Sequence, residues 1–146
     1  MYDRSYRGHR FEEEFFGYSA HGAIFPQGRI TYQNALEEVI NNQPNNWNPR
    51  RPHTNLSAGI CKKIATVLNV RSGLELYVSL GTPLDFLYGI DGFFLYYGHV
   101  VTFDLTVSIS KFNYKADVLI TRKEITNGKA WYLAKKIARG LYPKRI

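Results

Sequence analysis

The chain has little cysteine and no long apolar run. Cys61 is the only cysteine among the 146 residues, so neither an intrachain disulfide nor a cluster of thiolate metal ligands can form. No stretch approaches the about 18 uninterrupted apolar residues of a membrane-spanning helix. Residues 1–14, MYDRSYRGHRFEEE, are charged where a signal peptide needs an apolar segment. The sequence therefore predicts a cytoplasmic protein in a reducing compartment.

Several catalytic signatures are also missing. The sequence contains no Gly-rich phosphate-binding loop and no dinucleotide-binding fingerprint. His9, His21, His53 and His99 do not have the spacing of metal ligands, so we expect them to be surface or packing residues. Cys61 falls on an amphipathic stretch and is expected to pack rather than to act as a nucleophile.

What the chain does have is a globular composition and an excess of positive charge. Hydrophobic residues make up 45% and aromatic residues 15% of the sequence, which is enough for one folded domain. The net charge is +7, and the whole excess lies in residues 122–146, where eight Lys and Arg face the single acid Glu124. A basic segment favours a polyanion such as nucleic acid as a partner, and a solvated basic helix face is the alternative.

Hydrophobic periodicity predicts a mixed α/β order of elements. A period near 3.6 and N-capping residues indicate four helices, which we expect at residues 4–18, 31–42, 57–69 and 128–139, the last capped by Asn127. A period of two indicates four strands, expected at residues 74–80, 91–97, 99–109 and 115–121. The Asn- and Pro-rich residues 41–53 are expected to form a loop.

Two aspartates stand in this strand-rich part, in GIDGFFLYYGHVVTFDLTVS, residues 89–108. Carboxylates are depleted in strands, and a buried one is costly unless it is paired, protonated or bound to a cation. Alternation places Asp104 on the face opposite to Val101, Phe103 and Leu105. If that face meets water, Asp104 is an ordinary surface carboxylate, and Asp91 before Gly92 has the alternative of a turn-forming residue. Otherwise the two acids from neighbouring strands could hold one Mg²⁺ or Mn²⁺.

The strand expected at residues 115–121 carries a candidate lysine partner for Asp104. We expect residues 115–121 to pair antiparallel with residues 99–109, as a hairpin. With a four-residue turn at residues 110–113, Thr106 would lie opposite Asp117 and Ser108 opposite Lys115. That register would bring Lys115 close to Asp104, whereas a different turn length would slip the register and remove this placement.

Three short segments carry a resemblance to a known family. RGHRFEEEF, GIDGFF and TFDLT, in this order, resemble the first helix and the two acidic strands of the PD-(D/E)XK nuclease superfamily, in particular its resolvase-like members. The resemblance covers about residues 5–22 and 86–140. It implies a restriction-endonuclease-like mixed central β-sheet flanked by helices, in a single nuclease-like domain over residues 1–146. Residues 23–85, approximately, would then be a helical insertion.

The same resemblance implies an activity and its residues. The chain would be a Mg²⁺- or Mn²⁺-dependent endonuclease that hydrolyses DNA, with branched recombination or repair DNA as a candidate substrate and RNA as the alternative. Asp91 and Asp104 would hold the metal, and Glu12 would assist directly or through water. The family's lysine, two residues after the second acid, is replaced by Thr106, and Lys115 is the candidate to supply it from the next strand. Such small nucleases commonly act as homodimers.

Basic side chains elsewhere are candidates to hold the nucleic acid. These are Arg50, Arg51, Lys135, Lys136 and Arg139. Trp47, in the Asn-rich loop, could stack on an unpaired base or could anchor the loop to the domain. Two rival functions have no hydrolysis: a nucleic-acid-binding protein on a degenerate nuclease scaffold, favoured by Thr106, and a protein-interaction module with an aromatic surface.

Overall fold

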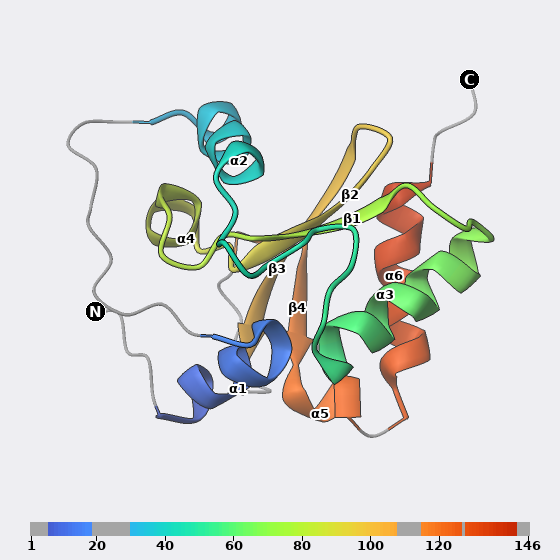
Figure 1. Cartoon of the computed structure of the whole chain (residues 1–146). Helices are drawn as coiled ribbons and strands as arrows, with labels where there is room; N and C mark the ends of the chain where they lie inside the picture. The colour runs from blue at the N-terminus through green and yellow to red at the C-terminus, as the bar shows by residue number, and fades with distance from the viewer. Residues whose placement is uncertain (1–5, 19–29, 108–114, 127, 143–146) are drawn as a thin grey trace.

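Figure 1 shows the computed structural model of the chain, whose described residues are 6–18, 30–107, 115–126 and 128–142. One four-stranded sheet lies between the helices, in the order β1–β2–β3–β4. The strands are β1 (Leu74–Val78), β2 (Gly92–Tyr96), β3 (His99–Thr106) and β4 (Val118–Thr121). β1 to β3 form an antiparallel meander, and β4 runs parallel to β3. The predicted mixed α/β class with a mixed central sheet is therefore confirmed.

The described residues contain six helices. They are α1 (Tyr6–Phe16), α2 (Tyr32–Asn41), α3 (Asn55–Leu68), α4 (Pro83–Tyr88), α5 (Arg122–Thr126) and α6 (Ala130–Leu141). The four predicted helices are confirmed within about two residues at each end. The cap predicted at Asn127 lies outside the described residues. α4 and α5 were not predicted, because helices of six and five residues are too short to show a repeated 3.6-residue period.

Helices α1, α3 and α6 cover one face of the sheet. The strand residues that point to this face include Leu76, Phe94 and Phe103, all fully buried. Phe15 of α1 packs edge-on against Phe103, with ring centroids 5.5 Å apart. α3 and α6 also pack against each other, as Figure 1 shows on the right of the sheet. This side holds the larger of the two hydrophobic clusters.

Helices α2 and α4 cover the opposite face. Tyr77 of β1 and Phe93 of β2 stack there with ring centroids 5.2 Å apart. Leu84 of α4 and Val39 of α2 belong to the same buried cluster. Because both faces are covered, the polar residues of β3 that point to this second face are buried as well.

Capping residues explain where α2 and α3 begin and where α3 ends. Thr31 and Thr54 are N-caps, each accepting a hydrogen bond from the main-chain N–H three residues on. Asn69 ends α3 in the left-handed conformation, with φ of 59°. Thr54 also donates to the main-chain oxygen of Phe15, so the start of α3 is tied to the end of α1.

The predicted hairpin between β3 and the following strand is wrong. Phe103 pairs with Val118 and Thr106 with Thr121, so the two strands run in the same direction. Parallel neighbours cannot be joined by a tight turn, and residues 107–117 separate the two strands here. The pairing of Thr106 with Asp117 is therefore also wrong. Asp117 instead accepts hydrogen bonds from the main chain and hydroxyl of Thr102.

The segment 23–85, which the resemblance leaves unmatched, contributes to the common layers of the structure. Its described part holds α2, α3, β1 and the start of α4. Ile64 of α3 and Leu76 of β1 belong to the same hydrophobic cluster as Phe11 of α1. Within the described ranges, no helix has the length and apolarity needed to cross a membrane.

Candidate metal site

Asp91 is held by main-chain hydrogen bonds at the point where β2 begins. Its N–H donates to the oxygen of Phe103 on β3, and its own carbonyl accepts from the N–H of Ser79, just after β1, both at 2.9 Å. The residue before it, Ile90, is buried and accepts a hydrogen bond from the Ser79 hydroxyl. Asp91 is therefore fixed between its two neighbouring strands. The residue is buried, with only 4% of its surface exposed.

Gly92 lets the chain pass closely beneath α1 at this point. A Cβ at residue 92 would lie 2.6 Å from Cζ of Phe103, 2.7 Å from the main-chain oxygen of Tyr77 and 2.9 Å from Cζ of Phe16. Such distances are well inside van der Waals contact, so only glycine fits here. The glycine thus fixes the position of the preceding aspartate.

Asp104 lies on β3, on the face covered by α2 and α4. Its neighbours on that face, Thr102 and Thr106, are buried, and Asp104 itself is 7% exposed. The alternative interpretation of Asp104 as an ordinary surface carboxylate is therefore wrong. The alternation of polar and apolar residues along β3 was predicted correctly, but the polar face does not meet water.

The structure brings the two aspartates together. Oδ2 of Asp91 accepts a hydrogen bond of 2.8 Å from the main-chain N–H of Leu105, the residue after Asp104. The side chains of Asp91 and Asp104 also hydrogen-bond to each other. Two carboxylates can do so only if they share a proton, because two adjacent negative charges repel.

The electrostatics of this pair follow from burial and from its neighbours. Burial raises the pKa of Asp91 well above its usual value, and the charges of Asp104 and Asp85 and the hydrogen bond to Asp104 raise it further. The N–H of Leu105 acts in the opposite direction. A bound cation would relieve this repulsion in the same way as a shared proton.

Further acids lie at this end of the sheet. Asp85 of α4 is 1% exposed, and its Oδ2 accepts a hydrogen bond of 2.9 Å from the N–H of Gly81. Glu12 of α1 is 5% exposed, and its Oε1 lies 4.0 Å from Nδ1 of His9. Tyr18 lies near both acids: burial raises its pKa, and the charges of Asp85 and Glu12 add to this. Tyr18 thus feels the charges of both Asp85 and Glu12, and the placement of Glu12 beside the aspartate pair stays a prediction of the resemblance.

Asp85, His9 and Tyr18 were not predicted as part of the site. The signal for Asp85 was present in Thr82-Pro83-Leu84-Asp85, since an acid three residues after a capping threonine commonly turns back to the start of a helix. The signal for His9 was its spacing of three residues from Glu12 on one helix. Tyr18 carried no such signal.

The structure removes the reason to place Lys115 near Asp104. Lys115 was placed near Asp104 by the antiparallel hairpin, which the structure replaces with a parallel pair. Asp104 pairs with Leu119, so Lys115 lies four residues upstream, before the first residue of β4, and it is exposed. Thr106, at the family's lysine position, is buried.

The predicted nucleic-acid-binding cations form two separate groups. Arg50 and Arg51 lie in the loop before α3, whereas the other three, Lys135, Lys136 and Arg139, are exposed on α6. Trp47 is 6% exposed, and its Nε1 donates to the oxygen of Leu76 at 2.9 Å. Trp47 therefore anchors its loop to β1, and its interpretation as a base-stacking residue is wrong.

The donor set limits the kind of ion that fits. In the part of the chain that the structure describes, no group of three or more His, Cys, Asp or Glu is arranged to hold a metal ion. Among the described residues, Asp91 and Asp104 supply a pair of adjacent carboxylates. Two carboxylates suit Mg²⁺ or Mn²⁺, which retain several waters and take further oxygens from substrate phosphate.

Comparison with protein-family models, with curated proteins and with solved structures finds no match to this chain.

Proposed function

We propose that the chain is a Mg²⁺- or Mn²⁺-dependent nuclease with a restriction-endonuclease-like core. The observation that carries this proposal is the hydrogen-bonded pair Asp91 and Asp104, two acids from adjacent strands that share a buried position. Burial of two like charges is costly. Carboxyl groups with a perturbed pKa concentrate at functional sites, and a bound cation would offset the repulsion between these two.

We assign the proposed roles by the chemistry of each residue. Asp91 and Asp104 would hold the ion, while the N–H of Leu105 fixes the orientation of the Asp91 carboxylate. When bound, the ion would supply Lewis-acid stabilisation of a phosphodiester and an acidified water. Glu12, close to His9 on α1, would accept a proton from that water. Asp85 would increase the negative potential that attracts the cation.

A cleavage assay tests this proposal. Labelled single-stranded, duplex and four-way-junction DNA would be incubated with Mg²⁺ or Mn²⁺ and with wild type, Asp104→Asn or the control Glu38→Ala, which alters an exposed acid on α2. We expect metal-dependent cleavage by wild type and the control, and its loss in Asp104→Asn. The absence of cleavage of every substrate, including a matching RNA strand, would contradict the proposal. Cutting of both strands of a duplex would be expected of a homodimer.

A second candidate function is binding of nucleic acid without hydrolysis. It is favoured by a specific observation: Thr106 occupies the position of the family's lysine, and the parallel pairing places Lys115 four residues before Leu119, the partner of Asp104. In this register Lys115 does not lie beside Asp104, where it could pair with a phosphodiester. Nucleic-acid binding that is the same in wild type and Asp104→Asn, with no cleavage at any metal concentration, would support this second function.

A further inference from the structure

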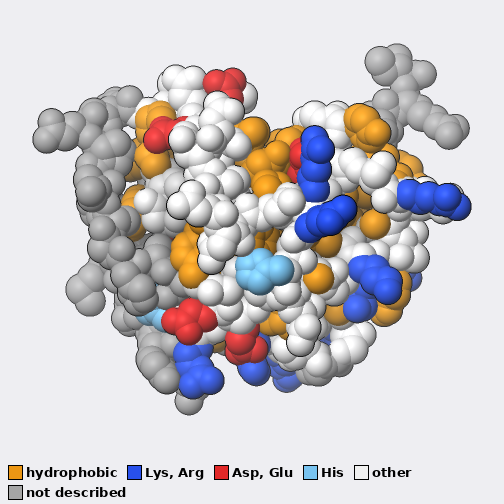
Figure 2. Space-filling view, in the orientation of Figure 1, with side chains coloured by type: hydrophobic (Ala, Val, Ile, Leu, Met, Phe, Trp, Pro, Cys, Tyr) orange, Lys and Arg blue, Asp and Glu red, His pale blue; other side chains and the backbone are white. Residues whose placement is uncertain are grey.

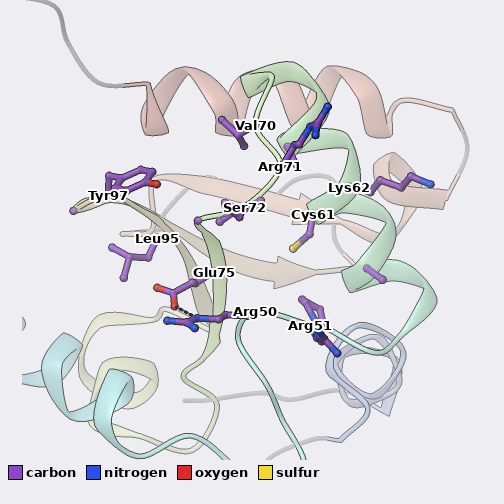
Figure 3. A pocket seen from close by; sticks show the side chains of 16 residues that line it. Arg50, Arg51, Cys61, Lys62, Val70, Arg71, Ser72, Glu75, Leu95 and Tyr97 are labelled. Atoms are coloured by element: carbon purple, nitrogen blue, oxygen red, sulfur yellow. Dashed lines mark hydrogen bonds and ion pairs between the residues drawn. The ribbon is translucent and has the colours of Figure 1, made fainter.

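A groove lies at the end of the sheet opposite to the aspartate pair. It encloses about 840 Å³ between the loop before α3, one flank of α3, the turn from α3 to β1, and the turn from β2 to β3. Asp91 adjoins the C-terminal end of β1, whereas Leu74 and Glu75, at the N-terminal end, line the groove. Because β1 has five residues, the two places are about 15 Å apart along the strand. Figure 3 shows the groove.

The groove is strongly cationic. Arg50, Arg51, Lys62 and Arg71 line it, and all four are exposed. Glu75 is the one acid among the lining residues, and its Oε2 is held 3.3 Å from Nε of Arg50. Figure 2 shows most of the Lys and Arg side chains of this face on the half formed by α3 and its adjoining loops. Such a field attracts a polyanion.

An aromatic side chain stands at the edge of the groove on a constrained turn. Tyr97 is 74% exposed and has a φ of 45°, followed by Gly98 with a φ of 83°. This two-residue hairpin turn favours Asn or Gly at its first position, and a tyrosine there is strained. Strain of this kind is commonly retained for function.

The ring of Tyr97 also packs against Tyr96 and lies close to Gly73. It packs edge-on against Tyr96, with ring centroids 4.7 Å apart. A Cβ at Gly73 would lie 3.1 Å from Cε2 of Tyr97 and 3.3 Å from Cε1 of Tyr96. Glycine at residue 73 therefore lets both rings lie against the turn between α3 and β1, which holds Tyr97 in place before any ligand binds.

We propose that this groove binds single-stranded nucleic acid, with the four cations on its phosphates and Tyr97 stacked on an unpaired base. Cationic grooves edged by aromatic rings are the common solution for single strands, because every unpaired base offers a face for stacking. In a duplex those faces are already stacked on each other and cannot meet Tyr97. The inference goes beyond the proposed nuclease, since it concerns binding alone and requires neither a metal nor the aspartate pair.

Fluorescence anisotropy with a labelled oligothymidylate of about 12 nucleotides tests the inference. EDTA is included, so that the result is independent of hydrolysis. We expect Lys62→Glu/Arg71→Glu to weaken binding by about tenfold or more and to lower the dependence of affinity on salt. The control Lys123→Glu/Lys129→Glu makes the same change of charge at two exposed residues outside the groove, on α5 and just before α6, and is expected to retain most of the affinity. Equal losses in the two variants would overturn the proposal, since net charge alone would then account for binding.

A second variant separates binding from folding. Tyr97→Asn places a favoured residue on the turn, so its melting temperature should equal or exceed that of wild type. We expect its affinity for the oligothymidylate to fall by about tenfold, and that of Tyr97→Phe to remain near wild type. Unchanged affinity in Tyr97→Asn, or tighter binding of wild type to a duplex, a vesicle of anionic lipid or an acidic peptide than to the single strand, would overturn the assignment.

Discussion

Asp91 accepts a hydrogen bond of 2.8 Å from the main-chain N–H of Leu105, so the acid before β2 is held against the residue that follows the acid of β3. This bond fixes two carboxylates side by side where little water reaches them. The consequence is a site whose stability depends on a proton or on a cation.

The first prediction concerns pH. Because folding raises the pKa of Asp91 above its ordinary 3.8, the folded state binds this proton more tightly than the unfolded chain. The resulting stabilisation is complete below about pH 3.8 and is lost as pH rises through the folded-state pKa. Asp104→Asn keeps a hydrogen-bond donor and removes one charge. We therefore expect the melting temperature of Asp104→Asn, relative to wild type, to increase between about pH 4 and about pH 8.

Thermal unfolding at several pH values measures this difference. Each 1 kcal/mol of relieved repulsion should raise the melting temperature by about 2–4 °C in a chain of this size. A difference between variant and wild type that does not change with pH would show that the two carboxylates do not interact.

The second prediction concerns divalent ions. Near neutral pH, Mn²⁺ at about one hundred times its Kd should stabilise wild type by about 2.7 kcal/mol, which corresponds to a rise of about 5–10 °C in melting temperature. The rise should be smaller in acid, where protons compete for the carboxylates. Asp91→Asn should show no rise, and the control Glu38→Ala the full one. An equal rise in Asp91→Asn would place the ion elsewhere.

Much of the fold could be predicted from the sequence because its helices and strands have a clear local periodicity. The four long helices show a 3.6-residue stripe, and the alternation of Phe103 with Asp104 assigned the two faces of β3 correctly. Asp91 and Asp104 could be singled out because carboxylates are uncommon in strand-like segments, and the structure brings these two side chains together.

The remainder depends on contacts between distant segments, which local patterns do not encode. Burial of Asp104 results from the cover that α2 and α4 provide, and α4 is too short to show a period. The direction of β4 is set by pairing with β3 and by the hydrogen bonds between Thr102 and Asp117. The wrong direction led in turn to the wrong position for Lys115.

The third prediction concerns the close approach at Gly92. Gly92→Ala would force its new methyl group into Phe103, Phe16 and the main chain of Tyr77, and we expect a loss of about 1–3 kcal/mol or more in the free energy of unfolding. Gly59→Ala is the matched control, because a Cβ there meets nothing within 4 Å on α3. It should gain about 0.5–1 kcal/mol. Urea unfolding of the two variants measures both, and equal effects would contradict the packing described here.

The fourth prediction concerns Trp47. Trp47→Phe removes the hydrogen bond to the oxygen of Leu76 and leaves a buried acceptor without that donor, which should cost about 1–3 kcal/mol. Affinity for the oligothymidylate should be unchanged at a temperature where the variant is folded, because Trp47 is buried. Loss of affinity without loss of stability would restore the base-stacking interpretation.

The most direct test of the central claim is the anomalous X-ray density of a crystal soaked in Mn²⁺. The account predicts one ion between Asp91 and Asp104, with carboxylate oxygens about 2.0–2.5 Å from it and the hydrogen bond between the two side chains broken. A saturating soak that leaves the two carboxyl groups bonded to each other, with no density between them, would contradict it.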